Sequence, residues 1–373
     1  FYIAVTFTAL PSAIVIRKVG YKNSMALGMG TMMVAGLLFI PAAKTQIFAL
    51  FLLAQLVMGA GQTLLQTAVN PYVVRIGPEE SAAARISVMG ILNKGAGVVA
   101  PVVFTALILS NFTDTVGTEL TPTQIDSMAN SLIFPYLGMA IFIGLLALSV
   151  KKSPLPELAS EADSEEEHTG HIKETLAHPN LILGVVALFF YVAAEVIAGD
   201  TIGTFALSLG VENYTMMTSY TMVCMVVGYI LGIALIPRFI SQQKALMVSA
   251  VIGLLLTAGI VFGDNNSFVI ADTLLGGLKL PDTLVMIAFL GFANAIVWPA
   301  VFPLALSGIG KLTSIGSALL VMGISGGAFG PLFWSITSTS TQMGEQGGYL
   351  TLFPCYLFIL FYAVKGCKMR SWR

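Results

Sequence analysis

Polar side chains interrupt the apolar stretches of this chain at a few widely separated places. Gln66 and Asn70 stand four residues apart, so they would share one face of a helix. Asn93 and Lys94 follow in the next apolar stretch. Amides both donate and accept hydrogen bonds, as the hydroxyl groups of an uncharged solute do. These residues therefore suit a binding site for a neutral polyhydroxylated molecule.

Later stretches add carboxylates, a further amide and aromatic rings. Glu195 and Asp200 lie in FFYVAAEVIAGDTIG, and Asn294 lies in LVMIAFLGFANAIVWP. Tyr191 and Trp298 flank these groups and could stack on the apolar face of a sugar ring, although most such aromatics only pack. We predict substrate contacts from Gln66, Asn93, Asn294, Tyr191 and Trp298, against the alternative that the amides only join neighbouring helices.

Lys94 is the most demanding of these side chains, because a lysine deep in an apolar segment needs a partner or water. Glu195 is the carboxylate at comparable depth, and Asp200 lies nearer the outer end. Glu195 could bind a coupling proton or only neutralise Lys94, and the two interpretations are equally supported.

Composition assigns the chain to the membrane proteins. Of its 373 residues, 56% are hydrophobic and 10% charged, whereas soluble domains are near a quarter charged. A net charge of −1 without a basic cluster argues against nucleic acid as a partner. The three cysteines have no paired spacing, so neither a disulfide framework nor a metal site is expected.

Apolar runs long enough to cross a bilayer predict eleven helices. They are expected near 1–16, 24–42, 47–74, 86–110, 131–150, 181–207, 215–236, 245–262, 284–306, 314–335 and 349–366. At ~1.5 Å per residue, Gln66, Asn93, Asn294 and Glu195 all fall in a common middle layer of the bilayer.

Lysines and arginines predict the orientation. Fifteen fall in alternate segments, beginning with RKVGYKNS, and only Lys44 and Lys279 fall in the others. Since basic residues collect on the cytoplasmic side, we expect a multi-pass protein of the cell membrane with a cytoplasmic C-terminus. We predict an N-terminal half at 1–150, a flexible cytoplasmic linker at 151–180 and a C-terminal half at 181–373.

The two predicted halves resemble each other. RKVGYKNSM at 17–25 matches RFISQQKALM at 238–247, and VMGI at 88–91 recurs at 321–324. Two parallel six-helix halves with a cytoplasmic linker are typical of the major facilitator arrangement. Because no helix precedes the first copy of the repeat, we expect that the first of twelve helices is missing from this chain.

Three residues have predicted roles in structure and gating. Asn70 precedes Pro71 and is expected to support a helix break. Arg85 begins a helix beside GPEES and is expected to hold the cytoplasmic gate.

Longer motifs resemble a known family. QTAVNPYVVRIGPEESAAARISVMGILNK, YVAAEVIAG and NAIVWPAVFPLALSGIGKLTSIGSALLVMGISGGAFGP are similar to the fucose:proton symporter-like family of the major facilitator superfamily. The resemblance implies uptake of a hexose with a cation, usually a proton. The fucose members carry glutamate where this chain has Gln66 and glutamine where it has Glu195. Their proton-carrying acid lies on the first helix, which we expect to be missing from this chain. Together with Asn93 and Lys94, this exchange resembles the glucose/galactose branch.

Several alternatives stay open at this point. The substrate could be N-acetylglucosamine or fucose, the coupling cation could be Na⁺, and a drug exporter or a non-transporting sugar sensor would share the architecture. We expect no enzyme activity, no cofactor beyond the coupling cation, and a monomer in the bilayer.

Overall fold

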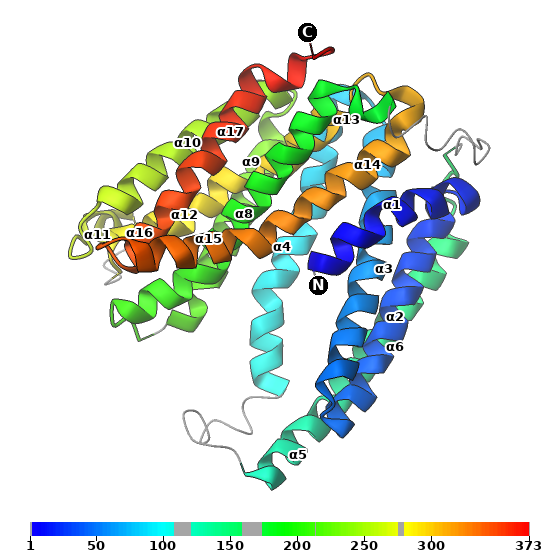
Figure 1. The fold of residues 1–373 in the computed structure, drawn as a ribbon, viewed down its shortest axis with the longest axis horizontal. Coiled ribbons are helices and arrows are strands. Elements are labelled where there is room, and N and C mark those ends of the chain that lie inside the picture. Colours follow the sequence, from blue (N-terminus) through cyan, green and yellow to red (C-terminus); the bar gives the residue numbers. More distant parts are fainter. Residues whose placement is uncertain (1, 108–120, 159–173, 213, 275–279, 373) are drawn as a thin grey trace. The chain divides into compact units, whose positions relative to one another are not determined.

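The computed structural model describes residues 2–107, 121–158, 174–212, 214–274 and 280–372, and the secondary structure of this part of the chain is helical. Figure 1 shows the helices in chain order. The longer ones are α1 (Tyr2–Val19), α2 (Tyr21–Thr45), α3 (Phe48–Arg75), α4 (Ala82–Leu107), α5 (Pro122–Ser131), α6 (Ile133–Lys152), α8 (Pro179–Ser208), α9 (Met217–Leu235), α10 (Gln242–Phe262), α12 (Asp282–Ala295), α13 (Val297–Leu306), α14 (Thr313–Met322), α15 (Gly326–Ser340) and α17 (Leu352–Val364). Shorter helices are α11 (Val269–Leu274) and α16 (Glu345–Gly348).

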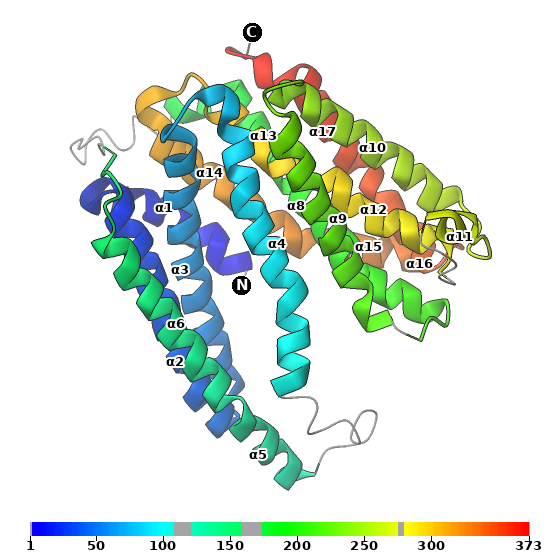
Figure 2. The same cartoon turned by 180° about the vertical axis from the view of Figure 1, so that it is seen from behind.

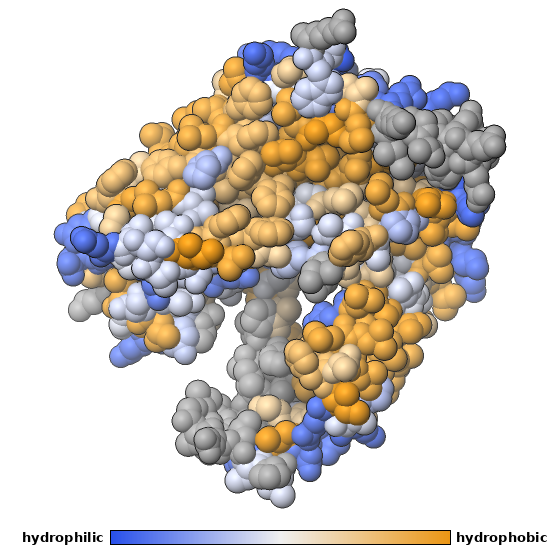
Figure 3. All heavy atoms as spheres, viewed as in Figure 1, coloured by the Kyte–Doolittle hydropathy of each residue, from blue (hydrophilic) through white to orange (hydrophobic). Residues whose placement is uncertain are grey.

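These helices agree with the predicted membrane spans. Within the described residues, nine helical segments are long and apolar enough to cross a membrane. At the two other expected positions, α1 has 18 residues and α4 has 26. Figure 3 shows one face, on which apolar residues cover the helix bodies and most strongly hydrophilic residues gather toward their ends. The all-helical membrane fold is confirmed.

The described chain packs as two compact units. The first comprises Phe1–Tyr72 and Val99–His168, and the second comprises Val73–Val98 and Thr169–Arg373. The start of α4 therefore groups with the helices that follow the linker. The predicted halves at 1–150 and 181–373 place it with the other helices before the linker.

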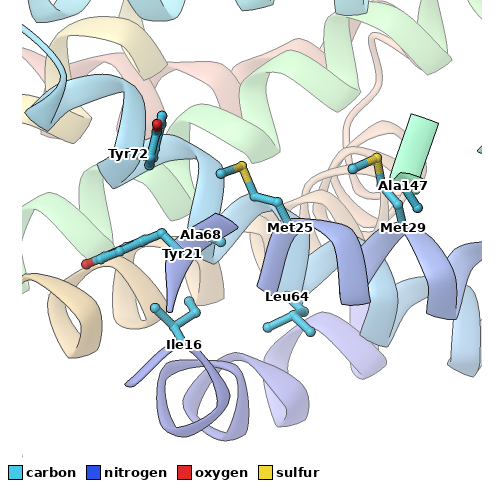
Figure 4. Packing of buried hydrophobic residues seen from close by; sticks show 8 residues of the cluster. All are labelled: Ile16, Tyr21, Met25, Met29, Leu64, Ala68, Tyr72 and Ala147. Carbon is cyan, nitrogen blue, oxygen red and sulfur yellow. The ribbon is translucent and has the colours of Figure 1, made fainter. Parts of the chain in front are cut away.

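In the first unit, α2 and α6 run side by side in both views (Figures 1 and 2). A buried cluster under these helices contains Ile16, Tyr21, Met25, Met29, Leu64, Ala68, Tyr72 and Ala147 (Figure 4). These residues come from α1, α2, α3 and α6, so the cluster joins four helices of the unit through apolar contact.

The linker begins with packed residues. Lys22 donates from Nζ to the Ser153 carbonyl at 2.6 Å, and the Tyr72 hydroxyl donates to the Pro156 carbonyl at 2.9 Å. Leu155 and Leu158 pack against the buried cluster. Residues 153–158 of the predicted linker therefore contact the first unit through these hydrogen bonds and through two apolar side chains. Residues 159–173 of the linker lie outside the described part.

In the second unit, α8 is surrounded by other helices and crosses α15 at close range. A Cβ added to Gly326 would lie 1.9 Å from the Phe189 carbonyl oxygen, and one on Gly330 would lie 2.6 Å from that of Ala193. Only glycine lets the two backbones approach this closely. The glycines of GISGGAFGP thus hold α15 against the helix that carries Glu195.

The predicted span at 284–306 is divided into α12 and α13 at Ile296. Pro299 has no N–H to donate to the Ala295 carbonyl, so the regular bonding is interrupted there. This break lies between Asn294 and Trp298, so the two side chains belong to different helices.

Candidate functional site

The centre of the candidate site is an ion pair between α4 and α8. The Lys94 ammonium contacts Oε1 of the Glu195 carboxylate, and the two side chains are 18% and 15% exposed. Counted along the helices, Lys94 lies roughly 18 Å beyond the start of α4 and Glu195 roughly 24 Å beyond the start of α8. Both groups therefore lie well inside a hydrocarbon core that is ~30 Å thick.

Asp200 and two tyrosines surround this pair. The Asp200 carboxylate is close enough to interact electrostatically with both Glu195 and Lys94. The Tyr191 hydroxyl is close enough to interact electrostatically with the Glu195 carboxylate and the Tyr229 hydroxyl. Tyr191 and Tyr229 are 2% and 4% exposed, so these hydroxyls serve the cluster rather than bulk water.

Tyr229 was missed by the sequence analysis, and Gly90 explains how it reaches the site. A Cβ added to Gly90 would lie 2.5 Å from the Tyr229 ring. The ring therefore occupies the space that a side chain at position 90 would fill. The sequence did show a tyrosine in the middle of the 215–236 span. It could not show that this tyrosine meets α4, because residue spacing along one helix does not reveal where another helix crosses it.

Asn294 is placed inside the second unit. It is fully buried, and its Oδ1 accepts a hydrogen bond of 2.9 Å from the Tyr356 hydroxyl of α17. Its Nδ2 is buried without a hydrogen-bond partner in the described structure. In this conformation the amide oxygen joins α12 to α17, which is the alternative to substrate contact that the sequence left open.

Asn93 and Trp298 differ in accessibility from Asn294. Asn93 is exposed, beside Lys94 in sequence, and Trp298 is half-buried. The Trp298 ring lies 6.4 Å from the Tyr191 ring and stacks on Phe302 at 5.7 Å between centroids. One end of this aromatic row thus reaches Tyr191, which adjoins Glu195.

Gln66, Asn70 and Pro71 lie on α3 in the first unit. Gln66 is half-buried, and its backbone carbonyl accepts a hydrogen bond of 2.9 Å from Nδ2 of Asn70. Helix α3 continues through Pro71 to Arg75. The amide of Asn70 therefore bonds the backbone one turn before it, next to the residue that lacks an N–H.

Arg85 links the end of α3 to the start of α4. Its guanidinium donates to the carbonyls of Val73 at 2.9 Å and Val74 at 2.8 Å, and also to Pro78 and Ser81. The last carbonyls of a helix lack partners within the helix and carry partial negative charge. Arg85 thus stabilises the turn between α3 and α4.

The second unit also joins this turn to α10. Nε2 of Gln242 donates to the carbonyls of Glu79 at 2.8 Å and Glu80 at 3.2 Å. Gln242 belongs to the repeated RFISQQKALM segment, so the loop repeat contributes a contact beside Arg85.

The arrangement of these groups suits the binding and release of a cation or proton. Lys94, Glu195 and Asp200 provide one ammonium and two carboxylates, so the cluster carries a net negative charge when all three are ionised. A cation near this cluster would be attracted, and a protonated carboxylate would release Lys94 from one partner. Ionisable groups at this depth commonly mark ion and substrate pathways.

Comparison with known proteins agrees with this architecture. Residues 1–331 match the family model described as Major Facilitator Superfamily. A glucose/galactose transporter of Brucella abortus biovar 1 (strain 9-941) is 31% identical over 380 residues, covering 99% of this chain and 84% of that protein. The L-fucose-proton symporter of Escherichia coli (strain K12) is 29% identical over 346 residues, covering 88% and 74%.

A solved structure extends the comparison to the fold. The crystal structure of the E. coli fucose:proton symporter FucP (N162A) has a TM-score of 0.82 and 23% identity, covering 97% of this chain and 88% of that one. The helices, the repeated loop segments and the family model all lead to one assignment. The chain belongs to the major facilitator superfamily.

Proposed function

We propose that this protein is a cation-coupled transporter of a neutral hexose, with glucose or galactose as its substrate. The observation that carries the coupling is the Lys94–Glu195 pair with Asp200 beside it, deep in the membrane-spanning helices. The similarity to a glucose/galactose transporter over 99% of the chain supports the substrate class. Its relatives are transporters rather than enzymes.

The expected substrate contacts are Asn93, Gln66 and Trp298. Exposed or half-buried side chains remain accessible to a solute, and Asn93 adjoins the charged cluster in sequence. Amides match sugar hydroxyls as donors and acceptors, and an aromatic face suits the apolar face of a pyranose. Asn294 would contact sugar only after giving up its bond to Tyr356.

We propose that the coupling cation is a proton bound at Glu195. A proton there neutralises one carboxylate and leaves Lys94 with Asp200 alone, so the cluster changes from a net negative charge to neutral between its two states. Sodium is the other candidate, since two carboxylates also offer oxygen ligands. The orientation follows the positive-inside distribution, with the C-terminus in the cytoplasm and the protein in the cell membrane.

Uptake into proteoliposomes tests the function. We expect labelled glucose and galactose to accumulate under an inward proton gradient, and each to compete at least tenfold better than fucose, about 1.4 kcal/mol. Accumulation driven only by a sodium gradient would reject the proton. Tighter competition by fucose would reject the substrate.

The variant Glu195→Gln tests the coupling residue. If Glu195 carries the proton, the variant should exchange labelled sugar across the membrane but fail to accumulate it. Glu212→Gln is the matched control, because Glu212 is exposed beyond the end of α8. Normal accumulation by Glu195→Gln would remove Glu195 from the coupling step.

A further inference from the structure

A second feature lies on the first unit and involves none of the residues of the charged cluster. A groove of about 980 Å³ runs between α2 and α6 and is lined by residues of these helices and of the end of α1. Figure 2 shows the two helices side by side along their length. Each residue of its lining belongs to the first unit.

Most of the groove is apolar and open. Leu27, Ile141 and Leu148 line it and are 49%, 55% and 54% exposed. Gly30 leaves a gap in its wall, because a Cβ added there would meet nothing within 4 Å. Ala147 lines the groove and also belongs to the buried cluster of Figure 4. An unbranched hydrocarbon chain fits such a surface.

One end of the groove is basic. Lys18 lies in the last turn of α1 and Lys151 in the last turn of α6, and both are exposed groove residues. Within the described chain neither ammonium has a hydrogen-bond or carboxylate partner. The nearby Glu157 accepts a hydrogen bond from the Lys22 backbone at the start of α2 instead.

The combination of apolar groove and basic end selects a ligand class. Two ammonium groups without an acidic neighbour in the lining favour a net negative headgroup over a zwitterionic one. The apolar length of the groove favours a ligand with an acyl chain over a free anion. We propose that this groove binds one anionic phospholipid, with its phosphate between Lys18 and Lys151 and an acyl chain along Gly30.

Native mass spectrometry of the purified protein in detergent tests this proposal without any transport measurement. We expect dioleoyl phosphatidylglycerol to bind at least tenfold more tightly than dioleoyl phosphatidylcholine. The double variant Lys18→Gln, Lys151→Gln should reduce this preference to less than twofold. Lys44→Gln, at the other end of α2, should leave it unchanged.

A second variant separates loss of the groove from loss of folding. Gly30→Leu places a side chain in open space and replaces glycine within a helix, so the lipid-free protein should be at least as heat-stable as the parent. It should nevertheless bind phosphatidylglycerol at least tenfold more weakly.

Other outcomes would overturn the proposal. One is equal binding of the two lipids, and another is a preference that survives in the double variant. Displacement of the lipid by inorganic phosphate alone would indicate a simple anion site, because phosphate has no acyl chain to occupy the groove. A lipid-free dimer would show that a second copy of the chain covers the groove.

Discussion

The Lys94–Glu195 pair makes a quantitative prediction about stability. Removing one partner of a buried pair costs about 3–5 kcal/mol, because it leaves a charge without compensation. Since both side chains retain some exposure, 18% and 15%, we expect Lys94→Met to reduce the free energy of unfolding by about 3 kcal/mol, the lower end. Lys94→Met leaves both Glu195 and Asp200 without an ammonium.

Glu195→Gln should cost less than Lys94→Met, because Asp200 remains close enough to attract the ammonium. The double variant should recover part of the loss, with a coupling energy of about 1–3 kcal/mol between the two positions. Unfolding of purified protein in mixed micelles measures all three free energies, with Lys44→Met, an exposed lysine at the end of α2, as the control.

Two results would refute this reasoning. Single-variant costs that add within about 0.5 kcal/mol in the double variant would show that the contact carries no net energy. A larger loss in Glu195→Gln than in Lys94→Met would show that Asp200 does not compensate Lys94.

Three further predictions concern other residues. Arg85→Ala should reduce the free energy of unfolding by about 2 kcal/mol, since hydrogen bonds from a charged donor contribute about 1.5–3 kcal/mol. In the same unfolding assay, Arg85→Lys should restore only part of the lost stability. Tyr356→Phe should cost about 0.6–1.7 kcal/mol and leave sugar affinity unchanged if Asn294 only joins helices; a changed affinity would place Asn294 at the substrate. In a background without native cysteines, an impermeant thiol reagent should label Ser127→Cys from outside and Lys152→Cys only after permeabilisation, and the reverse pattern would invert the orientation.

The helices and the pairing of Lys94 with Glu195 could be predicted from the sequence, because the bilayer restricts both. A membrane helix must be a continuous apolar run, so its position can be read from composition alone. A charge within such a run needs a partner at similar depth, which reduced the choices for Lys94 to Glu195. The structure joins these two residues.

Other parts of the site could not be read in this way. The hydroxyls of Tyr229 and Tyr356 meet partners on other helices, and those partners depend on crossing geometry. The packed start of the linker carries Leu155 and Leu158, whose apolar character was a signal, but its high content of acidic residues dominated the prediction. Asn294 was chosen for its depth in the span, and depth does not tell whether a side chain is buried between helices or accessible to a solute.

The contacts of α4 suggest how charge and packing are connected. Its first part is held in the second unit by Arg85 at its start, by Gly90 against the Tyr229 ring, and by Lys94 on Glu195. The first two contacts do not change when a proton binds, whereas the third loses most of its Coulomb attraction. If Glu195 binds the coupling proton as proposed, protonation weakens the hold on α4 at Lys94, while the bonds of Arg85 at the start of α4 stay unchanged. In the proposed transporter, a helix held at its start and kept only by Asp200 at Lys94 would respond to a solute at Asn93, the neighbouring residue.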